Sequence, residues 1–318
     1  MSRDVFYCSE QSRRVGEKAY GTASIGDVWL LVEYPTAWGP KPLHDSTLPP
    51  PVKNHLSAIL KNVPRSRLLF IKRERGCEGP VSCFLVRCRE RDPSILKFEL
   101  DDYQQLLEID VGAIAAGQTL GGGVLTQEPL FLVCTHGRRD KCCAKFGRPV
   151  YKSLVAHEGH TVWQSSHVGG DRFAANLVCF PHGLFYAHVS DEGGKRIADE
   201  YRAGRLVPAE YRGRACFSYP VQAAEYFVRS ESGIVALDEL RQVGCERTAR
   251  NVWSVRFVSA SDGRIHQAKV TARMSEFQNL ITCHAAEKQR VVQYVLDEYG
   301  ATAGGGAQES VTDLRFKV

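Results

Sequence analysis

The sequence lacks any apolar run close to the roughly 18 residues that a membrane-spanning helix needs. It also lacks a secretory N-terminus, because Met1 to Cys8 contain no long apolar core. The excess of positive over negative charge is small, since the chain has 41 lysines and arginines and 36 aspartates and glutamates. Basic residues do not gather among stacking aromatics, as a nucleic-acid surface requires. We therefore expect a cytoplasmic protein without a membrane or nucleic-acid partner.

The composition is that of a folded protein, with 43% hydrophobic and 24% charged residues in a chain of 318. These values exclude disordered, collagen-like and coiled-coil classes. At roughly 100–200 residues per domain, the length allows about two domains.

The first part of the chain alternates strand and helix patterns. Apolar runs predict buried strands over residues 28–32, 67–71 and 81–88, and apolar spacing predicts helices over 52–63 and 101–111. This order predicts a small α/β unit over residues 1–120. A glycine-rich stretch, Gly117 to Gly123, is the candidate boundary. It lacks the Lys-Ser/Thr that a phosphate-binding loop requires, so we interpret it as a linker or turn.

The second part, over residues 125–205, has the element order of a thioredoxin-like domain. The predicted elements are a strand (130–133), a helix (142–158), a strand (161–165), a hairpin (176–180 and 184–189) and a helix (192–201).

The last part, over residues 206–318, is predicted to be an appended α+β segment. Its predicted elements are helices over 219–228, 236–243 and 290–299, strands over 252–258 and 265–272, and a flexible tail after residue 303. The fold class expected for the whole chain is α/β.

The chain has eleven cysteines, a high and odd number. A cytoplasmic chain of this size does not need disulfides for stability, so each cysteine is a buried apolar residue, a ligand or a nucleophile. Most lie in strand-like runs. One neighbourhood differs, the loop from Cys134 to Ala144, which directly follows a predicted buried strand. A second polar loop, Trp163 to Ala174, also follows a strand. If the two strands are neighbours, both loops lie at one sheet edge, where α/β folds place their sites.

Five interpretations of these loops compete. A tyrosine-phosphatase loop requires arginine six positions after its cysteine, where this chain has Asp140. A thioredoxin-type redox pair has two intervening residues, whereas Cys142 and Cys143 are adjacent. Zinc accepts cysteine, histidine and carboxylate ligands but favours closer cysteine spacing. An iron–sulfur cluster accepts thiolates with histidines on one iron. Buried cysteines with a structural His167 are the fifth interpretation.

The residues of the two loops resemble the sucrase/ferredoxin-like family, in which the fold is similar to thioredoxin-like ferredoxins. The resemblance is carried by the segment from Cys134-Thr-His-Gly-Arg-Arg-Asp to Cys143, followed by Ser166-His167-Val168-Gly169-Gly170. It covers roughly residues 20–230. Further matching residues are Gly21-Thr22-Ala23, Trp38-Gly39, Asn176, Pro181 and Tyr186.

The resemblance implies a 2Fe–2S cluster with two cysteine ligands from the first loop and two ligands four residues apart from the second. Carried over, these are Cys134, Cys143, His167 and Asp171. Eukaryotic members have histidine where this chain has Asp171, and carboxylate is a harder ligand than imidazole. Asp171 is thus either the fourth ligand or a partner of Arg139 or Arg172, with His136, His182 or Cys142 completing the site.

Three further residues are expected around the cofactor. Arg139 would stabilise the negative charge of the cluster, and Gly169 and Gly170 would let the chain turn so that positions 167 and 171 both face Cys134.

We therefore predict an electron-transfer or redox-sensing protein that exchanges electrons with a reductase or another redox partner. Histidine ligation should raise the potential above that of an all-cysteine site and couple it to protonation. The alternative is a thiol oxidoreductase or a metal-free thioredoxin-like binding module. The sequence has no pair of carboxylates in a context typical of glycosidases, so a hydrolase is not expected.

Overall fold

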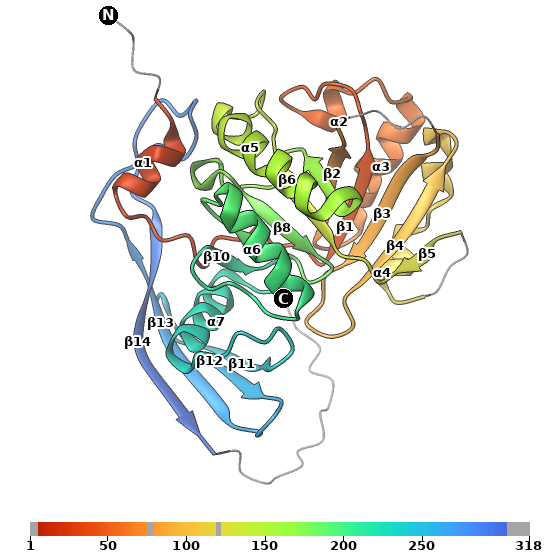
Figure 1. Cartoon of the computed structure of the whole chain (residues 1–318). Helices are drawn as coiled ribbons and strands as arrows, with labels where there is room; N and C mark the ends of the chain where they lie inside the picture. The colour runs from red at the N-terminus through yellow and green to blue at the C-terminus, as the bar shows by residue number, and fades with distance from the viewer. Residues whose placement is uncertain (1–5, 75–78, 119–121, 304–318) are drawn as a thin grey trace, which may run out of the picture.

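The structure is a computed structural model that describes residues 6–74, 79–118 and 122–303. Residues 119–121 of the glycine-rich boundary and the tail from residue 304 onward lie outside these described residues. Within the described residues, ten strands form one sheet in the order β10-β9-β8-β6-β7-β2-β1-β3-β4-β5 (Figure 1). In chain order they are β1 (Val28–Glu33), β2 (Ser66–Lys72), β3 (Val81–Arg87), β4 (Ser94–Leu100), β5 (Val124–Thr126), β6 (Leu130–Cys134), β7 (Val162–Ser165), β8 (Leu177–Phe180), β9 (Leu184–Tyr186) and β10 (Tyr211–Arg214).

Some of the helices pack on the two halves of this sheet, and others lie outside it. They are α1 (Cys8–Arg14), α2 (Pro42–Asp45), α3 (Pro50–Asn62), α4 (Val111–Ala115), α5 (Lys141–Glu158), α6 (Asp191–Arg202) and α7 (Tyr219–Ser232), with short 3-10 turns that include η1 (Tyr103–Glu108) and η3 (Asp171–Phe173). No helix in these described parts of the chain is both long and apolar enough to cross a membrane.

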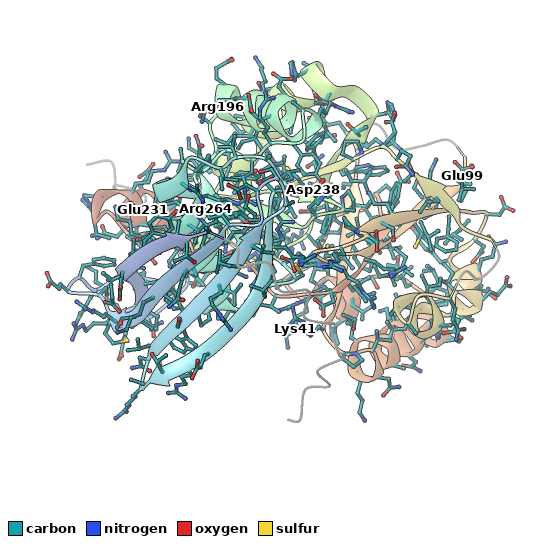
Figure 2. All side chains as sticks on the ribbon, turned by 90° about the horizontal axis from the view of Figure 1, so that it is seen from below. Lys41, Glu99, Arg196, Glu231, Asp238 and Arg264 are labelled. Atoms are coloured by element: carbon teal, nitrogen blue, oxygen red, sulfur yellow. The ribbon has the colours of Figure 1, made fainter. Side chains whose placement is uncertain are left out.

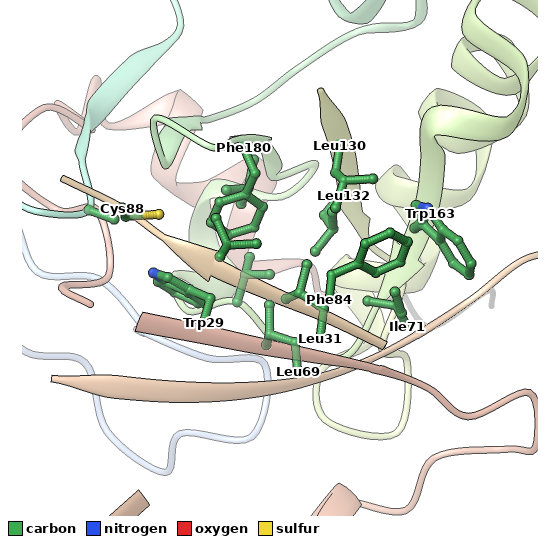
Figure 3. Packing of buried hydrophobic residues seen from close by; sticks show 14 of the residues in the cluster. Trp29, Leu31, Leu69, Ile71, Phe84, Cys88, Leu130, Leu132, Trp163 and Phe180 are labelled. Carbon is green, nitrogen blue, oxygen red and sulfur yellow. The ribbon is translucent and has the colours of Figure 1, made fainter. Parts of the chain in front are cut away.

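The sheet curls so that one of its faces packs against itself. Trp29 and Leu31 of β1 share a core with Phe84 of β3 and with Leu130 and Leu132 of β6 (Figure 3). The alternate residues of the same strands point to the outer face. There, β1 packs under α3 and α4, whereas β6 packs under α5 and α6. Both faces of these strands are therefore buried, which explains their continuous apolar runs.

The predicted order of strand, helix, strand, hairpin and helix is present from β6 to α6. β6 is parallel to β7 and antiparallel to β8, and β8 is antiparallel to β9. The strands predicted for the first unit belong to the same sheet, because β2 pairs with β7. The mixed α/β class is confirmed, and the predicted units 1–120 and 125–205 share one sheet.

A second sheet follows in the C-terminal part, at the opposite end of the molecule from β3 and β4 (Figure 2). In the described residues it consists of β11 (Leu240–Ala249), β12 (Val252–Ser259), β13 (Ile265–Met274) and β14 (Val292–Thr302), all antiparallel. Helix α7 packs on it and on β10. The buried carboxylate of Glu225 on α7 accepts hydrogen bonds from Tyr211 and Arg214 of β10, which fix α7 to the first sheet, while the apolar residues of α7 pack on the second.

Several sequence predictions are wrong in detail. The sequence predicts helices over 236–243 and 290–299, but these residues contain parts of β11 and β14. Their apolar spacing fits a helix locally, and pairing with β12 and β13 overrides that preference. Residues 101–111 form the 3-10 turn η1 and the start of α4 rather than one helix. Helix α1 was not predicted, because residues 1–24 show no clear apolar period.

Candidate metal centre

The two polar loops lie at the same edge of the sheet, as the sequence predicts. Cys134 is the last residue of β6, and its register partner on the parallel strand β7 is Ser165. The chain leaving β6 carries the first loop, and the chain leaving β7 carries His167 two residues later. Strand pairing alone therefore brings the two motifs together.

The first turn of α5 places Cys143 beside Cys134. Asp140 caps the helix, with its carboxylate accepting a hydrogen bond of 2.8 Å from the Cys142 N–H. Gly147, one turn further along α5, faces the end of β6. A Cβ at this position would overlap the carbonyl oxygen of Cys134, so only glycine lets the helix approach the strand this closely.

The four residues predicted as ligands meet in one place. Donor atoms of Cys134, Cys143 and His167 all lie within 4.8 Å of one another. The carboxylate of Asp171 lies 3.4 Å from Cys143 Sγ and 3.0 Å from His167 Nδ1. Both cysteines are fully buried, and Asp171 is 4% exposed. The structure thus brings together two thiols, one imidazole and one carboxylate.

His167 has no conventional hydrogen-bond partner for its buried Nδ1. The nearest group is the Asp171 carboxylate, whose Oδ1 makes an ion-pair contact of 3.0 Å with this nitrogen. A buried ring nitrogen without a hydrogen bond is costly, and either the Asp171 carboxylate or a metal ion can compensate for it.

The two thiols differ in acidity. The hydrogen bond from Cys143 is the main reason that the pKa of Cys134 falls well below its usual value, although burial opposes it. The same bond, together with burial, raises the pKa of Cys143. Burial would lower the pKa of His167, but the Cys134 thiolate and the Asp171 carboxylate outweigh it and raise the pKa. Both shifts favour a Cys134 thiolate beside a protonated His167 in the protein without metal.

Asp171 is a buried carboxyl group among other acidic groups. Burial raises its pKa to about 6, and the neighbouring His167 only partly offsets this. A cation bound between these residues would favour the ionised carboxylate.

Arg139 lies at the mouth of the site. It is exposed and lines a cavity of about 280 Å³ together with His167, Ser166 and Pro42. Its charge offsets a small part of the rise that Cys134 and Asp171 cause in the pKa of His167. His167, which is 22% exposed in its side chain, is the donor closest to solvent, so the cavity gives access to the site from this side.

The turn that holds His167 and Asp171 is fixed by Arg212, a residue that the sequence did not single out. Gly169 and Gly170 both have positive φ angles, of 94° and 82°. Arg212 is 1% exposed and donates hydrogen bonds to the Gly169 carbonyl (3.0 Å) and to Asn176 Oδ1 (2.7 Å). Asn176 in turn donates to the Gly170 carbonyl.

The other residues considered for the fourth position are engaged elsewhere. His136 pairs through Nε2 with the Gly39 carbonyl, and His182 pairs with the Tyr201 hydroxyl. Arg172 donates to Glu17 rather than to Asp171. The Cys142 thiol points away from Cys143 toward a separate group of residues that contains Cys8 and Cys283. Cys8 and Cys283 lie in segments without any motif, and no sequence signal places them here.

The fold and the donor set define a mixed α/β protein with a buried thiolate–imidazole centre. The sucrase/ferredoxin-like family matches residues 19–213, which is more than half of the chain, and the chain belongs to this family. The predicted resemblance is confirmed.

A curated relative is the altered inheritance of mitochondria protein 32 of Meyerozyma guilliermondii, which is 30% identical over 97 residues. The aligned part covers 27% of this chain and about a third (34%) of the relative. No solved structure matches the chain.

The residues present suit an iron–sulfur cluster. Cys134 and Cys143 would supply thiolates and His167 an imidazole, and the convergence of their donor atoms within 4.8 Å is the observation that fits this role. Asp171 is placed either to bind metal directly or to orient His167.

Proposed function

We propose that this protein carries electrons, or senses redox state, through a 2Fe–2S cluster held by a thioredoxin-like domain from β6 to α6. The observation that carries the proposal is the convergence of donor atoms of Cys134, Cys143 and His167, within 4.8 Å of one another, at one edge of the sheet. When bound, such a cluster accepts and releases a single electron.

The residues of the chain have distinct roles in this proposal. Cys134 and Cys143 bind from the buried side, and His167 binds from the side that opens into the cavity lined by Arg139. The cavity gives a redox partner or reductase its nearest approach to the site. Arg139 adds positive charge there, which favours the reduced, more negative form.

A cytoplasmic location is part of the proposal, and the cysteines support it. The ten cysteines that the structure describes are all free thiols, which suits a reducing compartment such as the cytoplasm.

Anaerobic purification followed by iron and acid-labile sulfide assays tests the proposal. We expect both elements in equal amounts and a red-brown protein with visible charge-transfer bands. A protein that stays colourless and free of iron and sulfide, even after anaerobic reconstitution with both, would overturn it.

A thiol oxidoreductase is the second candidate, favoured by the lowered pKa of Cys134 beside His167. Cys134 is fully buried, however, so a disulfide substrate has no direct access to its sulfur. Slow alkylation of Cys134 by iodoacetamide in the metal-free protein would argue against this candidate, and fast, selective alkylation would support it.

A further inference from the structure

A second group of soft ligands lies on the other side of α5. Donor atoms of Cys8, Asp140, Cys142 and Cys283 all lie within 4.8 Å of one another. The three sulfurs form a triangle with sides of 3.5 Å (Cys8 to Cys142), 3.2 Å (Cys142 to Cys283) and 3.5 Å (Cys283 to Cys8). Asp140 completes the group, with its oxygens 3.9 and 4.0 Å from Cys8 Sγ.

The members come from three separate segments of the chain. Cys8 begins α1, Asp140 and Cys142 lie at the start of α5, and Cys283 lies in the connection between β13 and β14. Figure 1 shows this connection returning from the second sheet to lie beside α1. Cys8, Cys142 and Asp140 are each 0% exposed, whereas Cys283 is only partly buried.

The geometry matches a tetrahedral zinc ion. With Zn–S bonds of about 2.3 Å, tetrahedral zinc separates its sulfur ligands by roughly 3.8 Å. The observed sulfur triangle is a few tenths of an ångström smaller, so only small side-chain movements are required. Three thiolates and one carboxylate also make up a closed set of four protein ligands, as structural zinc sites have.

Backbone groups around the cluster already favour negative charge. The N–H of Cys283 donates to Asp140 Oδ2 (2.6 Å), the N–H of Cys142 donates to Asp140 Oδ1, and the N–H of Cys8 points at Cys283 Sγ (3.4 Å). Such bonds orient ligands and stabilise their anionic form. The N-terminus of the 18-residue helix α5 adds its dipole.

A disulfide explains the group less well than a metal ion does. One disulfide would use two of the three sulfurs and leave the third thiol beside a buried carboxylate. An ion bound by all four residues would satisfy every member at once.

We propose that Cys8, Cys142, Cys283 and Asp140 form a structural zinc site, separate from the centre around Cys134. The ion ties helix α1 and the connection between β13 and β14 to the first turn of α5. It thereby fixes the helix end that also carries Cys143. The proposal does not rest on the proposed iron–sulfur function.

Metal analysis of the full-length protein tests the site. We expect about one zinc per chain in the wild-type protein. Cys283→Ser should lose the zinc, because it removes one of the four ligands. This ligand is chosen because it lies in a partly exposed connection, where the fold tolerates the change. Cys245→Ser, at an exposed cysteine of β11, is the matched control and should keep its zinc. Cys134→Ser should also keep zinc while it loses any iron, which separates the two sites.

Cobalt provides the second measurement. To exclude binding at the first centre, the titration uses Cys134→Ser protein. Adding Co²⁺ to this protein, reduced and zinc-free, should produce sulfur-to-cobalt charge-transfer bands that saturate at one ion per chain, and the double variant with Cys283→Ser should not produce them. The proposal is overturned if Cys134→Ser protein binds neither ion, if the double variant binds them equally well, or if mass spectrometry finds these cysteines joined as a disulfide in protein prepared with reductant.

Discussion

The guanidinium of Arg212 occupies the space into which a side chain at Gly170 would extend. A Cβ at Gly170 would lie 2.5 Å from Arg212 Nη2. Arg212 is held in place by bonds to Thr22, Gly169 and Asn176, so it cannot swing aside. A glycine next to the candidate ligands is thus required by an arginine that lies about 40 positions later in the chain.

Gly170→Ala should therefore destabilise the protein and reduce its iron content. Alanine at a φ of 82° costs about 1–2 kcal/mol, and the collision with Arg212 adds to this. Gly204→Ala is the matched control, because Gly204 has a φ of 72° but open space around its Cα. Urea unfolding should show a larger loss for Gly170→Ala, and only this variant should lose iron. Equal losses in both variants would contradict the packing argument.

The adjacent cysteines should behave differently. Cys143→Ser should abolish or strongly shift the visible spectrum, because Cys143 lies with Cys134 and His167. Cys142→Ser should lose zinc and keep the visible bands at their wild-type positions, with at most a lower cluster content, because its sulfur faces Cys8 and Cys283. The reverse result would move the ligand assignment by one residue.

Substitutions of Asp171 distinguish a direct ligand from an orienting residue. Asp171→Ala should cause cluster loss if the carboxylate binds iron. Loss of a residue that only orients His167 typically weakens metal binding by about 10–100-fold. Asp171→His restores the ligand of eukaryotic family members and should retain iron at least as well as the wild-type protein. Unchanged iron content, spectrum and potential in Asp171→Ala would leave His167 as the only ligand from the second motif.

Arg139→Ala should lower the reduction potential, because it removes a positive charge that shares a cavity with His167. Arg138→Ala is the control, since Arg138 is equally exposed but lines a different cavity, with Thr135 and Arg148. Spectroscopic redox titration measures both. The same potential in the wild-type protein and in Arg139→Ala would show that Arg139 does not influence the reduction potential of the site.

Stability should fall as the pH falls from about 7 to about 4, partly through His182. Burial lowers the pKa of His182 to about 4. The unfolded chain takes up this proton near pH 6.5, so stability present above that pH is lost as the pH falls toward the folded-state pKa. The shift corresponds to at most about 3 kcal/mol. Urea unfolding at several pH values should show a shallower pH dependence in His182→Gln, whereas His160→Gln, at an exposed histidine, should match the wild-type slope. An unchanged slope in His182→Gln would contradict this.

Much of the large sheet was predictable because its strands are buried on both faces. The apolar runs of β1, β2 and β6 identify them without tertiary information. The second sheet was predicted less well. β11 and β14 have one exposed face, and their mixed apolar spacing allowed a helical interpretation until pairing with β12 and β13 decided the matter.

The sequence by itself determined that Cys134, Cys143 and His167 converge, because they lie in two short motifs that each follow a strand, and parallel pairing of β6 with β7 brings such motifs together. Only the tertiary structure decided what surrounds them. Arg212 reaches the glycine turn from β10, and Cys8 and Cys283 meet Cys142 from positions up to 275 residues apart in the chain. Contacts over such separations depend on how the sheets and their connections pack, and no local spacing in the sequence records them.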